Sequence, residues 1–146
     1  MSVRTAALFL FAFAFPVSAI AEEKSDQKKI QGKWKMESGQ QGGKPLPEAM
    51  VKSGTLVVDG NKMKMAVSVE GQEKTHELTF KLDPSQKPRA IDVEINGKPG
   101  LGIYSLEGDT LKICAAQAGS KDRPTDLTAK AGSDRLLIVL KKEKAK

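Results

Sequence analysis

The sequence predicts an all-β domain of about eight antiparallel strands closed as a barrel, with one short helical turn between the first two strands. Three observations predict this fold class. Apolar and polar residues alternate with a period of two in most segments. Gly, Asn and Asp interrupt these segments at short intervals, as hairpin connections do. No long segment has the helical period, and closure of a strand meander removes its two exposed edges.

The N-terminal residues 1–21 have the form of a secretory signal peptide. Arg4 supplies a basic start, residues 6–15 are apolar, and residues 19–21 fit a small-residue cleavage site. We expect cleavage after residue 21, with an uncleaved anchor as the alternative, and an exported product in the periplasm or outside the cell. Residues 22–146 then form a single domain, in which no apolar run reaches membrane-spanning length.

The elements follow from the alternation and from the turn residues between the segments. A helical turn is expected at 46–51, after a Gly-Gly-Lys-Pro stretch. The last strand is apolar at every position, so we expect it to be covered on both faces. In chain order, the expected strands span residues 30–38, 55–58, 62–70, 74–82, 91–95, 101–107, 110–114 and 136–140.

Two early hairpins have strong turn signals. The Asp-Gly pair at 59–60 favours a two-residue type I′ turn, which needs positive φ at both positions. That turn would place Leu56 opposite Met63. The following Gly-Gln turn would place His76 opposite Val67, with both side chains on the apolar face.

The hairpin around Gly108 has the most regular pattern in the chain. A Gly-Asp pair suits a type II′ turn, in which Gly occupies the first central position. This turn places Tyr104 opposite Ile113 on the apolar face. It places Cys114 on the opposite face, where the only cysteine of the chain packs outside the barrel or under a covering segment. The hairpin is therefore expected to be a wall of the barrel.

Several stretches resemble an uncharacterised family of small secreted lipocalin-like domains, found widely in planctomycete bacteria. The resemblance implies a barrel in which Trp34, preceded by Gly32, plugs one end and Arg135 packs over it as a cation. Leu127 stands where that family usually carries an aromatic residue. With Gly60 and Gly108 in their turns, these residues form the expected structural set. The matching stretches are GKWKMES, GGKPLP, KLDPSQKPRAID, GIYSLEGDTLKIC, RPT and LIVLK.

The composition disfavours several classes of function. The net charge is +6 and four of the five phenylalanines lie in the signal segment, so stacked nucleic acid is a poor partner. One cysteine and one histidine are too few for a zinc site, and no disulfide can form within the chain. No nucleophile motif, phosphate loop or HExxH pattern occurs. We therefore expect no catalytic residue, no metal and no cofactor.

The lysine-rich stretch 141–146 is the most strongly charged part of the chain. It is typical of a solvated chain end. The alternative is a weak anchor to an anionic surface, such as lipid headgroups or cell-wall polymers.

The inward-facing side chains give the best guide to function. We expect a secreted, non-enzymatic, monomeric, lipocalin-like module that binds a small apolar or amphiphilic molecule. The alternative is a loop-mediated interaction or inhibitor module of the cell envelope, with a filled core and with prolines at 44–47 and 123–125 presented to a protein. The expected ligand-lining residues are Met65, Val67, His76, Phe80, Tyr104 and Ile113.

Overall fold

The computed structural model describes residues 25–117 and 119–143, so the expected signal segment and its cleavage site lie outside the described residues. A short helix at residues 25–29 precedes the first strand. The remaining elements, in chain order, are β1 (Gly32–Gln41), β2 (Lys44–Pro45), α2 (Glu48–Ser53), β3 (Thr55–Asp59), β4 (Lys62–Val69), β5 (Gln72–Asp83), β6 (Ala90–Ile95), β7 (Lys98–Glu107), β8 (Thr110–Ala115) and β9 (Leu136–Lys142).

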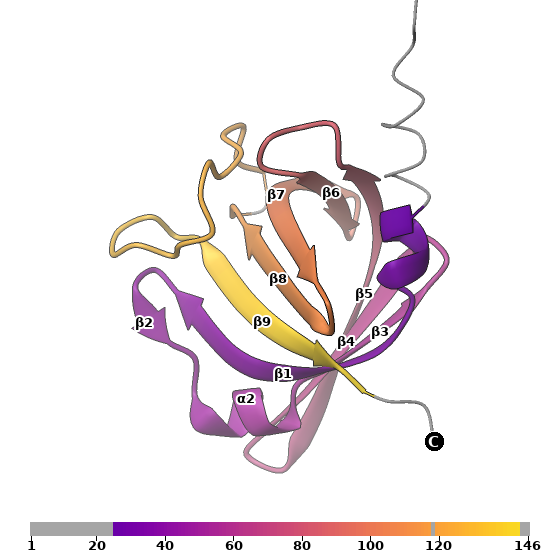
Figure 1. Ribbon diagram of the computed structural model, residues 1–146. Helices are drawn as coiled ribbons and strands as arrows, with labels where there is room; N and C mark the ends of the chain where they lie inside the picture. Colours follow the sequence, from indigo (N-terminus) through magenta and orange to yellow (C-terminus); the bar gives the residue numbers. More distant parts are fainter. Residues whose placement is uncertain (1–24, 118, 144–146) are drawn as a thin grey trace, which may run out of the picture.

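The strands form a closed antiparallel barrel (Figure 1). From β3 onward each strand pairs with its neighbour in the chain, and β1 pairs with both β3 and β9, which closes the sheet on itself. Among the described residues, eight strands make the barrel wall and the two-residue β2 is an extra strand on the end of β1. The expected fold class, a lipocalin-like eight-stranded barrel, is confirmed.

The hairpin between β7 and β8 has the predicted register. Tyr104 pairs with Ile113, and Ile103 pairs with Cys114. Gly108 has φ of 55°, a conformation that glycine adopts without strain. The apolar alternation and the turn residue specify the same register here, so the sequence alone was sufficient to predict it.

The two earlier hairpins differ from their predicted registers by two residues. The first turn is Gly60-Asn61, so Val58 rather than Leu56 pairs with Met63. In the second, His76 pairs with Met65 rather than with Val67. A shift of two residues leaves every side chain on the same face, so the hydrophobic pattern cannot distinguish the alternatives.

Two helices accompany the barrel. α2 begins two residues later than predicted and packs against β1 and β4. The Ser53 hydroxyl at its end accepts a hydrogen bond from the backbone N–H of Ser68 at 2.8 Å and so ties α2 to β4. The helix at 25–29 has no counterpart among the predicted elements. In the described residues, no helix is long and apolar enough to cross a membrane.

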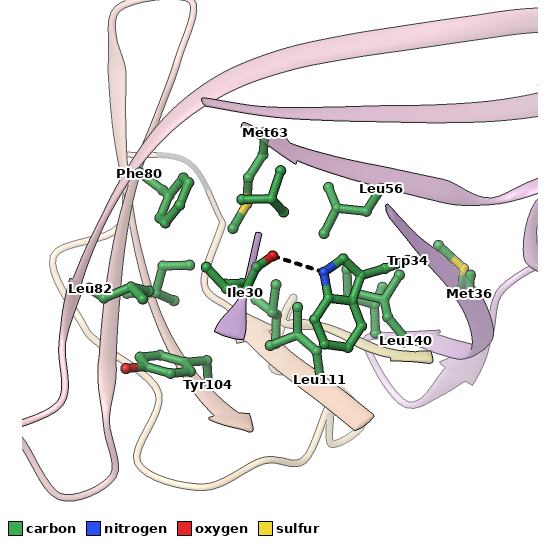
Figure 2. Packing of buried hydrophobic residues seen from close by; sticks show 14 residues of the cluster. Ile30, Trp34, Met36, Leu56, Met63, Phe80, Leu82, Tyr104, Leu111 and Leu140 are labelled. Atoms are coloured by element: carbon green, nitrogen blue, oxygen red, sulfur yellow. Dashed lines mark hydrogen bonds between the residues drawn. The ribbon is translucent and has the colours of Figure 1, made fainter. Parts of the chain in front are cut away.

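The core fills the barrel from one end. Trp34, Ile30 and Tyr104 are almost fully inaccessible to solvent and pack with apolar side chains from the wall strands (Figure 2). On the outer face of β7 and β8, Ile103 and Cys114 are also fully buried. The Cys114 thiol donates to a carbonyl of the segment 119–135, so Cys114 packs under this covering segment.

Candidate functional site

One end of the barrel, here called the closed end, is sealed by residues 25–31. Ile30 enters the barrel, and its carbonyl accepts a hydrogen bond of 2.9 Å from the Trp34 indole Nε1 (Figure 2). The side-chain amides of Gln27 and Gln31 both donate to the carbonyl of Gly60 in the turn between β3 and β4. Gly60 N–H in turn donates to Gln31 Oε1 at 2.7 Å. The helix, the first strand and this turn are thereby held together.

The cation over Trp34 is Lys142, which corrects the expectation for Arg135. Lys142 Nζ lies 5.6 Å from the centroid of the Trp34 ring and donates to the carbonyl of Lys29 at 3.1 Å. Arg135 instead directly precedes the start of β9, and its guanidinium pairs with the Asp126 carboxylate of the covering segment at 3.4 Å. Gly32, with φ of 115°, lets β1 begin directly beside Lys142.

A buried carboxylate fixes the helix to the wall at the closed end. Asp26 is 3% exposed, accepts a 2.6 Å hydrogen bond from the Tyr104 hydroxyl and pairs with Arg89 at 3.0 Å. Burial, followed by the hydrogen bond to Asp26, raises the pKa of Tyr104 well above its ordinary value. In the described residues, every buried side-chain polar atom has a partner. The closed end is therefore a satisfied, structural seal.

The opposite end, here called the open end, contains a cavity of about 340 Å³. It lies where β6, β8 and the start of β9 come together with the end of β1. The aliphatic lining comes from the barrel wall, and the polar side chains Gln41, Gln117 and Asp134 stand around it. The lining residues are Gln41, Val93, Ile95, Gly100, Ala115, Ala116, Gln117, Asp134 and Leu136.

Small inward-facing residues create this space. Gly100, Gly102 and Ala115 occupy the inward positions of β7 and β8 at the open end, whereas Tyr104 and Ile113 fill the corresponding positions toward the closed end. Gly100 also allows close packing, since a Cβ there would lie 2.8 Å from a Val93 methyl group. The interior is consequently filled toward the closed end and hollow toward the open end.

None of the six residues that the sequence proposed as ligand lining borders this cavity. Phe80, Tyr104 and Ile113 belong to the packed core, with Met65 against it. Val67 is buried on β4, and His76 is exposed on β5 beside Met65. Phe80 borders a separate hollow of about 280 Å³ between β5 and β6.

A feature of the sequence could have predicted part of the cavity lining, namely small residues at inward positions of a strand. In β7, Gly100 lines the cavity. Gly102 continues the same face toward Tyr104 at a close backbone approach, where a Cβ would lie 2.9 Å from the Cys114 carbonyl oxygen. Glycine at inward positions of a strand marks missing side-chain volume or a close backbone approach. Large apolar residues, by contrast, mark the places where the barrel is full.

The segment 119–135 is anchored to the barrel rather than presented to solvent. Arg123 donates to the carbonyls of Ile91 and Gly102, at 3.3 and 2.8 Å, and pairs with Asp92. Pro124 is buried. These contacts engage Arg123 and Pro124, in one of the two proline stretches of the interaction-module alternative, whereas Pro45 and Pro47 of the other stretch are exposed.

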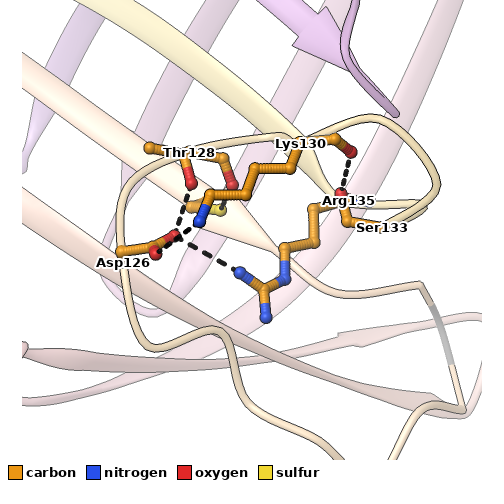
Figure 3. A network of polar contacts seen from close by, with 6 residues as sticks. Asp126, Thr128, Lys130, Ser133 and Arg135 are labelled. Carbon is orange, nitrogen blue, oxygen red and sulfur yellow. Dashed lines mark hydrogen bonds and ion pairs between the residues drawn. The ribbon is translucent and has the colours of Figure 1, made fainter.

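A second set of polar contacts holds the same segment together (Figure 3). Asp126 receives hydrogen bonds from Thr128 and Arg135, and the Thr128 hydrogen bond contributes most to lowering the pKa of the Asp126 carboxyl. The Cys114 thiol donates to the Thr128 carbonyl at 3.6 Å, and burial raises the pKa of this thiol. Burial therefore favours the protonated thiol over the thiolate.

The described residues contain no group of three or more His, Cys, Asp or Glu side chains placed to hold a metal ion.

No family model and no curated protein matches the sequence. Among solved structures, the crystal structure of a mutant of the fluorescent protein UnaG is similar, with 10% sequence identity, a TM-score of 0.41, and coverage of 81% of this chain and 99% of that chain. The lipocalin-like barrel itself is established by the strand pairing of this chain, which closes between β1 and β9.

Proposed function

We propose that this protein is an exported, non-enzymatic binding module that holds one small apolar or amphiphilic molecule in the open end of its barrel. The observation that carries the proposal is the cavity of about 340 Å³ next to a packed core. A barrel sealed at one end and hollow at the other has a single direction from which a ligand enters. Export is included because the N-terminal sequence has the form of a signal peptide.

The lining limits the chemistry of the ligand. Val93, Ile95 and Leu136 offer an apolar surface, so the favourable contribution comes from burial of apolar area. Gln41 and Gln117 provide amide donors and acceptors at the rim, which suit one polar group that remains near solvent. The volume lies at the lower end of ligand sites, which span roughly 300–1,000 Å³. A short chain or a small ring system fits better than a large pigment or lipid.

The proposal contains no catalytic step. The polar side chains that line the cavity, Gln41, Gln117 and Asp134, do not form a nucleophile paired with a base. We also propose that the chain belongs to the family of secreted lipocalin-like domains. The resemblance in sequence and the barrel architecture support this proposal.

A filled cavity tests the proposal. Ala115→Phe places an aromatic ring into the space, whereas Thr75→Phe adds the same ring to the exposed outer face of β5 and likewise leaves the charge unchanged. We would titrate each variant with the fluorescent probe 1-anilinonaphthalene-8-sulfonate. We expect the Kd for the probe to rise at least about tenfold in Ala115→Phe, which corresponds to about 1.4 kcal/mol. Thr75→Phe should bind as the unaltered protein does. Equal binding by the two variants would refute a site at the open end.

A further inference from the structure

Basic side chains are concentrated on one part of the outer barrel surface. The strand registers place Lys33 and Lys35 of β1 near Lys64 of β4 and Lys141 of β9, all directed outward and exposed. We call these four lysines the basic wall. They come from segments far apart in the sequence and are brought together by closure of the barrel. Lys112 on β8 borders the wall across β9.

Two of the wall lysines, Lys33 and Lys35, have cross-strand neighbours unlike those of lysines on other strands. On β5 and β6, charges of opposite sign face each other, as Lys81 and Asp92 do. Within the wall, Lys33 and Lys35 face the uncharged Val57 and Thr55 across β1 and β3. An ordinary solvated surface intersperses the two signs, so the excess of positive charge is greatest at these two lysines of β1.

Acidic side chains border the wall without neutralising it. Glu77 faces Lys64 from β5, and the Glu37 carboxylate lies 4.0 Å from Lys141 Nζ with both side chains about half exposed. Glu143 follows the end of β9, where the sequence continues with two further lysines at 144 and 146. Asp59 is exposed on the same face of β3 as Val57 and faces Lys62 of β4. Exposed pairs of this kind are weak, so the lysines of the wall keep their attraction for an external anion.

The basic wall includes an unfavourable arrangement within the protein itself. Lys35 and Lys141 are directly opposite each other on β1 and β9, and like charges in this position destabilise a sheet. Anions bound across the two strands would remove the repulsion.

One apolar side chain stands within the wall. Val57 lies between Lys33 and Lys64 in the cross-strand register. It is 39% exposed and is the one large hydrophobic residue exposed to this extent among the described residues. An exposed apolar group with a lysine on each neighbouring strand suits a surface that has anionic groups outside and hydrocarbon beneath.

We propose that the basic wall docks the protein onto an anionic phospholipid surface. The wall spreads across four neighbouring strands, β9, β1, β3 and β4, and so matches an extended surface. It carries no aromatic side chain on which a nucleotide base would stack. The docked protein keeps its open end free, because none of the wall residues lines the cavity. The docking is independent of the proposed ligand site.

The expected strength follows from the charge count. A lysine near an anionic bilayer contributes enough to change partitioning about fivefold. Removal of three lysines should therefore weaken binding to the vesicles about a hundredfold. Added salt should also weaken this binding, because it screens exposed charges. A contribution that arose only from net charge would be the same wherever three lysines were removed.

Vesicle co-sedimentation of the protein tests the proposal. The probes are vesicles of phosphatidylcholine alone and of phosphatidylcholine mixed with phosphatidylglycerol. The test variant is Lys33→Gln/Lys35→Gln/Lys64→Gln. The control variant, Lys81→Gln/Lys98→Gln/Lys121→Gln, has the same net charge with the wall intact. We expect the unaltered protein to bind the mixed vesicles and not those of phosphatidylcholine alone. The control variant should retain this binding, and the test variant should lose it.

Three results would overturn the proposal. The first is that the protein does not bind the mixed vesicles, and the second is that both triple variants lose binding equally. The third is that the protein self-associates without vesicles and that the test substitutions, but not the control substitutions, abolish this association. That result would assign the wall to contact with a second copy of the chain. The thermal unfolding midpoint of each variant is measured alongside. Because Lys35 faces Lys141, the test variant should unfold no earlier than the control.

Discussion

The contact between Tyr104 and Asp26 allows a sharp prediction about the seal of the barrel. Tyr104→Phe removes one hydroxyl and leaves the ring packing in place. The lost hydrogen bond is 2.6 Å long and joins two side chains that are 1% and 3% exposed. Asp26 keeps its contacts with Arg89 at 3.0 and 3.2 Å, so its charge is not left unpaired.

The magnitude follows from these contacts. A hydrogen bond to a charged group contributes about 1.5–3 kcal/mol, and the remaining Arg89 contacts place this one toward the lower value, at about 2 kcal/mol. Asp26→Ala removes the partner of both Tyr104 and Arg89. The Arg89 side chain is 40% exposed and regains water, so we expect about 3 kcal/mol rather than the larger loss of a fully buried pair.

Urea denaturation with tryptophan fluorescence measures both values. Trp34 is the single tryptophan of the chain, and its indole is bonded to Ile30 at the closed end. The two single variants and the double variant complete a cycle, for which we predict a coupling energy of about 1.5–2 kcal/mol between Asp26 and Tyr104. A coupling below about 0.5 kcal/mol would refute the idea that this contact holds the seal.

The same hydroxyl predicts an alkaline loss of stability. The folded-state pKa of Tyr104 is raised, by burial first and by Asp26 second, so the folded protein keeps its proton after the unfolded chain has lost it. The contribution is complete below the unfolded pKa of about 10 and declines as pH rises above it, by about 1.4 kcal/mol per unit. The difference in unfolding free energy between the unaltered protein and Tyr104→Phe should shrink above that pH. A constant difference would contradict the assignment.

The remaining predictions concern single residues. Gly108→Ala should lower the unfolding free energy by about 1 kcal/mol through its positive φ alone, since no atom lies within 4 Å of the added Cβ; an unchanged urea midpoint would contradict this. Lys142→Met should cost about 0.5–1 kcal/mol and alter Trp34 fluorescence, whereas Arg135→Met leaves that spectrum unchanged. The Cys114 thiol should react with Ellman's reagent only upon unfolding, and rapid native-state reaction would show it to be accessible.

The barrel could be predicted because its pattern is redundant. Alternation repeats in most wall strands, and a two-residue error in register, as at Met63 and His76, leaves each side chain on its proper face. The register around Gly108 was correct because the turn residue and the alternation specify the same pairing. The predicted fold class is therefore correct even though two hairpin registers were predicted wrongly.

The seal and the cavity were harder to predict. Residues 25–31 are too few to show a helical period, and Asp26 meets Tyr104 only through a contact between segments far apart in the sequence. The cation over Trp34 is Lys142 and not the expected Arg135, because the end of β9 and not its start lies beside Trp34. The six expected ligand-lining residues are mostly large inward side chains, and such side chains fill space. The cavity lies instead at Gly100 and Ala115, where side-chain volume is missing.

The central claim is that the open end holds a small molecule. The most direct measurement is a native mass spectrum of the protein purified gently from its own source, with Ala115→Phe purified in parallel. The account predicts a reproducible additional mass on the order of a few hundred daltons on the unaltered protein, as expected for a ligand of this site volume, and none on the variant. A bare mass for both proteins, or the same additional mass on both, would contradict it.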